Sequence, residues 1–141
     1  MHRLGATLLR LILGVIYVMH GYLALFVYGP GGAAGLMGNV MGIPAPALLV
    51  WYLIAAHLAG GAMLILGLWT RWAALANVPI MLCAVLLLHA QQGFFMGARI
   101  VDAAAGRAQP AGYEFSLLVL VATLAQVLLG GGALALTRDG R

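Results

Sequence analysis

The amino-acid sequence predicts an all-α fold, an integral membrane four-helix bundle that forms a single transmembrane domain over residues 1–141. Composition is the first observation: 65% of the residues are hydrophobic and 7% are charged, whereas about 25% are charged in a typical soluble domain. Charge placement is the second, since no Lys, Arg, Asp or Glu occurs in 11–70, 72–98 or 115–137. A spanning helix needs about 20 apolar residues, so these windows hold two, one and one crossings. An ordinary soluble globule and a disordered chain are both excluded.

The first predicted helix covers about residues 4–27, and Arg3 and Arg10 flank its start. A basic start before an apolar run is also typical of a signal peptide, but no small-x-small cleavage site follows here. We therefore expect a retained helix. A turn-rich stretch follows, and residues 33–41 are short, apolar and rich in glycine. This pattern predicts a short interfacial segment between the first two helices.

Three further helices are predicted, at about residues 47–69, 72–90 and 113–136. Pro79 lies inside the predicted helix at residues 72–90. Because proline lacks a backbone N–H donor, we expect a bend in that helix. A long loop at residues 91–112 leads to the final helix. Together with the first helix, these segments account for most of the chain and leave no room for a soluble domain.

The arginines predict the orientation of the bundle, N-in and C-in. With four crossings, both termini and the turn at residues 70–71 lie on one side of the membrane. That side carries five arginines and the other side two: Arg3, Arg10, Arg71, Arg138 and Arg141 against Arg99 and Arg107. The positive-inside rule then places both termini in the cytoplasm. Because the arginines are scattered at helix ends, no nucleic-acid partner is expected, and the lipid bilayer is the predicted partner.

Small residues and a single cysteine add to this pattern. Gly60-Gly61 in the second predicted helix predicts close helix packing, and the glycines at 130–132 predict loosened turns near the end of the fourth. This content of small residues is compatible with a homo-oligomer, although no motif fixes an interface. Cys83 is the only cysteine, which excludes an internal disulfide and a Cys-x-x-Cys pair. We expect it to be a packing residue.

Polar residues inside the predicted spans are the candidates for function. His20, His57, His89 and Glu114 each come from a different predicted helix, and their depths place all four in the outer half of the membrane. An ionisable residue at the centre of a spanning helix costs about 2.5–3.5 kcal/mol. Such residues usually face the bundle interior and mark a site. Taken by itself, His20 also fits a packing role. His89 and Glu114 also fit solvated positions at helix ends. We interpret the four together as candidate catalytic residues.

Three chemistries fit this set, and the residues alone leave all three open. One is a quinone or phenol site, in which imidazole and carboxylate hydrogen-bond the ring oxygens and exchange protons. The aromatic residues predicted to pack against the ring are Tyr17, Tyr22, Trp51, Tyr52 and Phe94. A second is a zinc, iron or copper site with His20, His57, His89 and Glu114 as ligands. The third is a haem held by two histidines.

The sequence resembles the DoxX family of small membrane proteins over nearly the whole chain. Four stretches carry the resemblance in order, one for each predicted helix: residues 9–14 with His20-Gly21, residues 60–74, His89 with residues 93–95, and residues 112–115. The resemblance implies a four-helix protein of the bacterial or archaeal cytoplasmic (inner) membrane. The family includes the small-subunit type of thiosulfate:quinone oxidoreductase, and members associated with quinone handling and with thiol or oxidative stress.

Two positions depart from the family pattern. Residues 22–26 stand where the family often has a lysine, and His57 stands where it usually has a glutamate before the paired glycines. The histidine gained in this way favours the metal or haem chemistry.

The leading hypothesis is a membrane redox protein that binds a quinone or similar small ring in the outer half of the bundle. It would couple this ring to oxidation of a reduced sulfur compound or a partner, as a quinone-linked oxidoreductase or a subunit of one. A second hypothesis is a non-enzymatic subunit that anchors or assembles a membrane or periplasmic protein partner. A third is a histidine-rich membrane protein that binds a metal or haem. Cofactor content and co-purifying proteins distinguish the three.

Overall fold

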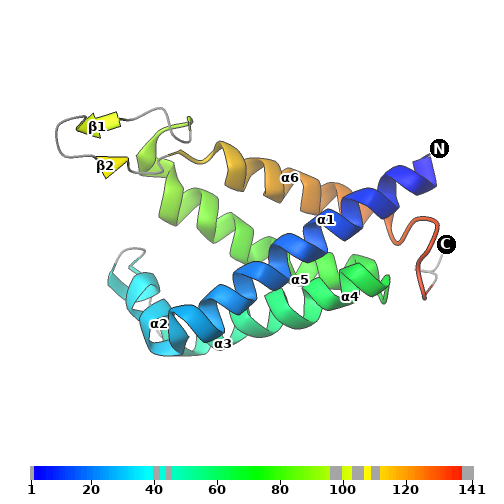
Figure 1. Cartoon of the computed structure of the whole chain (residues 1–141), viewed down its shortest axis with the longest axis horizontal. Coiled ribbons are helices and arrows are strands. Elements are labelled where there is room, and N and C mark those ends of the chain that lie inside the picture. The colour runs from blue at the N-terminus through cyan, green and yellow to red at the C-terminus, as the bar shows by residue number, and fades with distance from the viewer. Residues whose placement is uncertain are drawn as a thin grey trace.

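The structure is a computed structural model in which the chain forms four apolar helical rods packed side by side (Figure 1). It describes the following parts of the chain: residues 2–39, 42–43, 46–95, 100–102, 107–108 and 112–137. The four rods comprise, in chain order, α1 (His2–Tyr22) with η1 (Leu23–Val27); α3 (Pro46–Ala55) with η2 (Ala56–Gly60) and α4 (Gly61–Leu66); α5 (Thr70–Cys83) with η3 (Ala84–His89) and η4 (Ala90–Gln92); and α6 (Glu114–Leu129). Of the η elements, η1, η2 and η3 are π-helical and η4 is a 3-10 turn.

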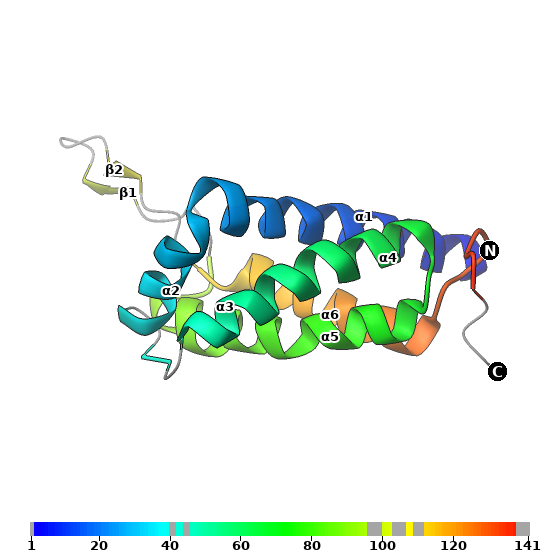
Figure 2. The ribbon, with the colours of Figure 1, turned by 90° about the horizontal axis from the view of Figure 1, so that it is seen from below.

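Two smaller pieces join the rods at one end of the bundle. The helix α2 (Gly29–Asn39) connects the first two rods where the sequence predicts a short interfacial segment. Within the predicted loop before α6, the strands β1 (Ile100–Asp102) and β2 (Arg107–Ala108) pair antiparallel. Figure 2 shows α2 and the strand pair at the same end of the long axis. We call this the cavity end.

The exterior of the rods is apolar, as expected of a surface that faces lipid. Three helical stretches are long and apolar enough to cross a membrane, namely His2–Val27, Pro46–Leu66 and Thr70–His89. Large side chains on them point outward, among them Leu8 at 68% exposure and Leu86 at 63%. A water-soluble monomer rarely exposes apolar surface so continuously.

The fourth rod is shorter than the sequence predicts. We expect a helix over about residues 113–136, but α6 ends at Leu129 and has 16 residues, a length of about 24 Å. The helix stops because Gly130 and Gly132 adopt positive φ angles of 71° and 76°. The glycine run therefore ends the helix instead of loosening its last turns, and α6 remains a short apolar helix.

Two apolar clusters hold the rods together. The larger lies between α1, α4, α5 and α6 and includes Leu13, Leu64 and Val119. The smaller lies beneath α2, where Ala33 and Met37 pack against buried residues of α3 and η1. The interfacial segment is thus a helix with a buried face, which begins at Gly29 rather than near residue 33.

The paired glycines of the second rod pack against two different neighbours. A Cβ atom on Gly61 would lie 2.9 Å from the carbonyl oxygen of Gly14 on α1, and one on Gly60 would lie 2.8 Å from Nδ2 of Asn77 on α5. Close helix approach through small residues is the usual way that membrane helices pack. The prediction of close packing at Gly60-Gly61 is confirmed.

The opposite end of the bundle, which we call the closed end, is sealed by the segment at residues 130–137. The backbone N–H of Ala133 bonds to the carbonyl of Arg3, and that of Thr137 bonds to the carbonyl of Gly67. Both ends of the described chain therefore lie together, as Figure 1 shows. Their common side agrees with the predicted topology, while the direction of insertion stays a prediction.

Arg10 is part of the closed end and is not the flanking charge that the sequence suggests. It lies in the third turn of α1 and is 1% exposed. Its guanidinium donates to the carbonyls of Leu64 and Ile65 at 3.1 and 3.3 Å, and to that of Leu134 at 3.2 Å. A cation is favourable at the C-terminal end of a helix. Arg10 therefore joins α1 to the end of α4 and to the final segment.

Candidate functional site

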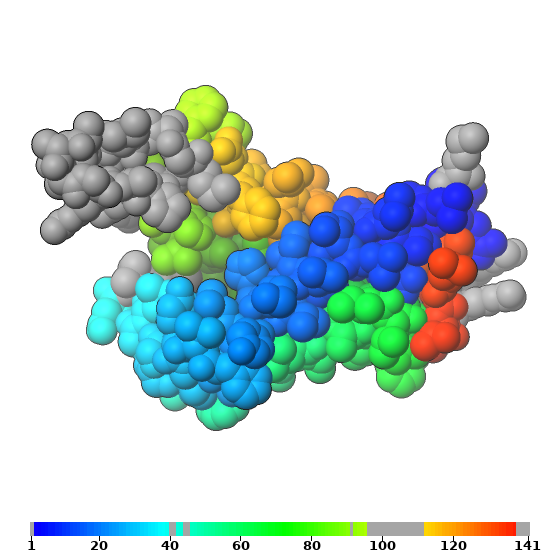
Figure 3. Space-filling view, in the orientation of Figure 1, coloured from blue at the N-terminus to red at the C-terminus, as the bar shows by residue number. Residues whose placement is uncertain are grey.

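A cavity of about 390 Å³ opens between the rods at the cavity end. Residues from α1, η1, α2, α3, η2, α5, η3 and α6 line it, and most of these residues are apolar. In Figure 3 the surface is indented between the α2 side (cyan) and the η3 side (yellow-green) at this end. Small-molecule sites are typically apolar cavities of about 300–1,000 Å³ with a few polar groups.

Three of the four predicted catalytic residues, His20, His57 and His89, line this cavity. Each lies in or beside a π-helical stretch, since η2 contains His57, η3 ends at His89 and η1 begins three residues after His20. Single π-helical turns inside α-helices are frequent at functional sites. The sequence pattern gives no sign of these turns.

His57 is the buried member of the set, at 5% exposure. Its Nδ1 atom lies 2.7 Å from Oδ1 of Asn77, which is fully buried on α5. The Nδ2 group of Asn77 donates in turn to the carbonyls of Ala56 at 3.1 Å and Ala73 at 2.9 Å. Asn77 therefore fixes the ring of His57 to two helices. Sequence reasoning missed Asn77, although a lone asparagine in a charge-free span was a visible signal.

His20 and Tyr17 approach His57 from α1. The ring centroid of His57 lies 5.0 Å from that of Tyr17 and 6.4 Å from that of His20. We call Tyr17, His20 and His57 the histidine cluster. Gly21 permits this approach, because a Cβ there would lie 3.1 Å from Cβ of His57. The His20-Gly21 pair thus combines a ring that faces the cavity with a close contact to the opposite rod.

The other two candidates lie at helix ends, His89 at the end of η3 and Glu114 at the start of α6. Nδ1 of His89 lies 2.8 Å from Oε1 of Gln92, which orients the ring at the end of η3. Glu114 begins α6, is half-buried and interacts with other groups of the protein. It does not line the cavity. The structure therefore brings His20 and His57 into one cluster, and places His89 on the same cavity.

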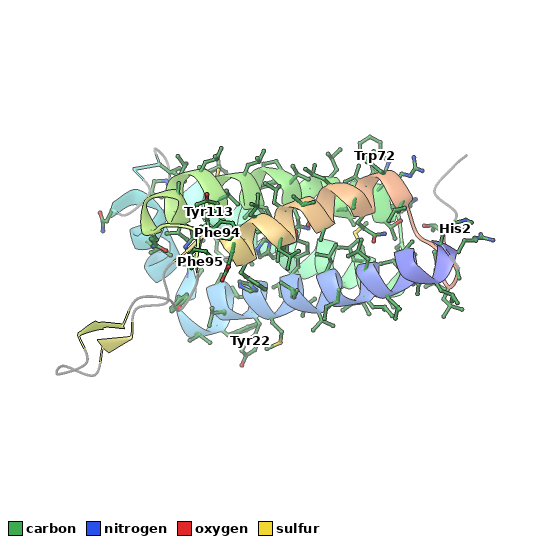
Figure 4. The ribbon with its side chains drawn as sticks, turned by 90° about the horizontal axis from the view of Figure 1, so that it is seen from above. His2, Tyr22, Trp72, Phe94, Phe95 and Tyr113 are labelled. Atoms are coloured by element: carbon green, nitrogen blue, oxygen red, sulfur yellow. The ribbon has the colours of Figure 1, made fainter. Side chains whose placement is uncertain are left out.

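The predicted ring-binding aromatics divide between the cavity and the outer surface. Tyr17 and Tyr52 line the cavity, and the hydroxyl of Tyr52 donates to the carbonyl of Ala76 at 2.6 Å. Tyr22 points away from the bundle in Figure 4, and Trp51 is 55% exposed. Phe94 packs edge-on against Tyr113, with ring centroids 5.4 Å apart. Neither Tyr22, Trp51 nor Phe94 lines the cavity.

The side chains around the cavity provide few of the ligands that a metal ion needs. Within the part of the chain that the structure describes, no three His, Cys, Asp or Glu side chains gather closely enough to hold an ion. Cys83 lines the cavity as a free, half-buried thiol instead of packing entirely in the core. Among the described residues, the cavity therefore does not bring three protein ligands together around one position.

The chain matches the profile of one protein family. The profile of the DoxX family matches residues 5–90. The chain belongs to the DoxX family. Comparisons with curated proteins and with solved structures found no match.

The DoxX match covers nearly all of the first three rods and includes His20, His57, His89 and Asn77. Glu114 and the rest of α6 lie beyond it, so the resemblance at residues 112–115 stays a prediction. With three apolar helices long enough to span a bilayer, this DoxX chain is a membrane protein. The family match says nothing of which ring, metal or haem such a protein binds.

Proposed function

We propose that this DoxX protein is a membrane redox protein that binds a quinone or a similar small ring in the cavity beside the histidine cluster. One observation carries the proposal: a mostly apolar cavity of about 390 Å³ has two histidines in ring contact on its wall. An apolar wall accommodates the faces of an aromatic ring, and a few convergent polar groups fix its orientation. Imidazole is the side chain best suited to exchange protons near neutral pH.

Each member of the histidine cluster has a role in ring binding that follows from its position. Tyr17 belongs to the larger apolar cluster, packs against the ring of His57 and forms one wall of the site. His57, held by Asn77, orients one ring oxygen and exchanges a proton with it. His20 is exposed and offers a second exchange position nearer the opening. The cavity lies toward the α2 end of the bundle, which the arginine count places at the outer side of the membrane.

The redox balance needs a second component. Reduction of one quinone to a quinol takes up two electrons and two protons. Two reduced sulfur groups that join through one S–S bond release two electrons, so a reduced sulfur compound, free or on a partner protein, balances the reaction. We assign this chain the binding of the ring and the proton exchange, as a quinone-linked oxidoreductase or a subunit of one.

Ligand binding tests the proposal. A short-chain benzoquinone and its hydroquinone are titrated separately and anaerobically into the purified full chain in detergent, and each Kd is measured by calorimetry. We expect at least one of the two to bind the native protein, and His57→Leu to weaken that binding about tenfold, the loss of one good hydrogen bond. His2→Leu, at the closed end, is the matched control and leaves the Kd unchanged.

Two results would contradict the proposal. Failure of both ring forms to bind the native protein removes the proposed function. Binding with the same Kd to the native protein and to His57→Leu keeps a ring ligand but removes the assigned site.

A further inference from the structure

The polar hydrogens of the histidine cluster are already used within the protein. Both hydrogens of the Asn77 amide point at backbone carbonyls, those of Ala56 and Ala73. Carbonyls only accept hydrogen bonds, so the amide orientation is fixed and its Oδ1 faces His57. Because Oδ1 only accepts, Nδ1 of His57 carries the hydrogen of the neutral ring. Nε2 is left as a bare acceptor.

The polar hydrogens of the other two members of the histidine cluster, His20 and Tyr17, are also used within the protein. Nδ1 of His20 lies 2.8 Å from the carbonyl oxygen of Ile16, so it donates, and Nε2 of the neutral ring is again bare. The hydroxyl of Thr123 donates to the carbonyl of Val119 at 2.7 Å. The Thr123 oxygen therefore accepts from the hydroxyl of Tyr17, whose hydrogen is used there. The histidine cluster thus offers a ligand acceptors and no donor.

We propose that the histidine cluster selects the hydroxyl form of a ring, a hydroquinone or another phenol, over the oxidised quinone. A ring hydroxyl donates to a bare Nε2 atom, whereas the two oxygens of a quinone only accept and leave that nitrogen unpaired. A site built to bond a hydroxyl discriminates strongly against an analogue that lacks it. Asn77 is then a positioning residue, which holds the hydrogen of His57 on the side away from the ligand. The inference rests on the proposed function and adds to it the redox state of the ring that the site prefers.

Other polar groups also lie on the cavity wall. Tyr28, Cys83 and Ser116 line the cavity, as does His89, which bonds to Gln92. Tyr28 and Ser116 serve a ring of either redox state, because a hydroxyl rotates to donate or to accept, and the Cys83 thiol is a weak donor and a weak acceptor. In the arrangement with Gln92 Oε1, Nδ1 of His89 donates, so His89 behaves like the histidine cluster. Tyr52, whose hydrogen goes to Ala76, behaves like the histidine cluster. The preference therefore comes from the fixed hydrogens and not from the free hydroxyls.

A redox-silent pair of ligands tests the preference most cleanly. 4-Propylphenol and its methyl ether share a ring and differ in whether the oxygen carries a hydrogen. For the native full chain we expect the phenol to bind about tenfold more tightly than the ether, and the hydroquinone about tenfold more tightly than its quinone. For Asn77→Leu and for His57→Leu we expect both preferences to fall below about threefold.

Nitrogen NMR of ¹⁵N-histidine-labelled native protein reads the cause directly, whether or not the variants fold. We expect the Nε2 atom of His57 to be unprotonated above the titration range of the ring. A protonated Nε2 atom in the neutral ring overturns the inference. So does equal or tighter binding of the quinone or ether, or a preference that survives in folded Asn77→Leu. In each of those cases the ring still binds and the proposed function stands, whereas loss of all ring binding contradicts the proposed function itself.

Discussion

The two ends of this bundle use buried polar side chains in opposite ways. At the closed end, Nη1 and Nη2 of Arg10 donate to the carbonyls of Leu64, Ile65 and Leu134, while its Nε has no hydrogen-bond partner among the residues that the structure describes. At the cavity end, Asn77 bonds to helix carbonyls as well, but its remaining oxygen holds the ring of His57. One end is a set of contacts among the chain's own groups, and the other leaves nitrogens and volume for something else.

The difference lies in what fills the space beside each polar group. Gly67 leaves room for the Arg10 guanidinium, since a Cβ there would clash with Nη1 of Arg10 and would lie 2.6 Å from Cα of Ala135. Backbone therefore surrounds Arg10 on several sides. Beside His57 the neighbouring rods diverge toward α2, and a cavity of about 390 Å³ remains. A buried polar residue in a membrane helix thus indicates a site only where it is accompanied by unfilled volume.

Removal of the Arg10 side chain should have the largest effect on stability. Arg10→Ala leaves three buried or half-buried carbonyls without their donor, and we expect a loss of about 3 kcal/mol in the free energy of unfolding. Unfolding in detergent by a chemical denaturant measures it. The control is Arg71→Ala, whose exposed guanidinium makes one 3.4 Å hydrogen bond to Leu128. Equal effects of the two changes would mean that Arg10 is not a structural link of the closed end.

Contact between α1 and α4 is the next most sensitive feature. In Gly61→Ala the new methyl group meets backbone atoms of Gly14 and Val18 at 2.9 Å. Backbone cannot move aside cheaply, so we expect a loss of about 1–3 kcal/mol in the free energy of unfolding. Gly5→Ala, in the same helix α1 as Gly14, meets no atom within 4 Å. That control should be neutral or stabilising by up to about 1 kcal/mol, and a destabilised control would refute the steric explanation.

Tyr17→Phe should have a smaller effect on stability and separates structure from binding. The change removes the hydrogen bond to Thr123, and we expect a loss of about 1 kcal/mol in the free energy of unfolding. Because the Tyr17 hydrogen points to Thr123, ring affinity should change less than about twofold. Parallel unfolding and calorimetric titrations check both numbers. A tenfold loss of affinity in a stably folded Tyr17→Phe would show that this hydroxyl contacts the ligand.

The helical rods and the depth of the histidines could be predicted from the sequence. Charge-free windows predict the rods well because lipid imposes length and composition on any spanning helix. Comparing depths along antiparallel helices also places His20 and His57 in the same half of the membrane, and the structure adds that their ring centroids lie 6.4 Å apart. These predictions depend on periodic or averaged properties, which local sequence expresses directly.

Features that depend on tertiary contact are among those that sequence reasoning missed. Arg10 reads as a flanking charge, because only the folded chain brings the carbonyls of α4 and of residue 134 to it. Asn77 reads as a neutral residue, because its role exists only when His57 arrives from another rod. The end of α6 at Leu129 depends on two glycine φ angles. The first two follow from an approach between segments far apart in the chain, whereas the end of α6 follows from local backbone angles that the sequence does not fix.

Photolabelling of the purified full chain with a photoreactive benzoquinone, mapped by mass spectrometry, tests the central claim most directly. We expect label in the segments that line the cavity, residues 16–24, 53–57 and 80–89, and competition by unlabelled short-chain hydroquinone. We expect no specific label at residues 130–137 of the closed end. Label that concentrates at 130–137, or label at the cavity that His57→Leu does not reduce, would contradict a ring site at the histidine cluster.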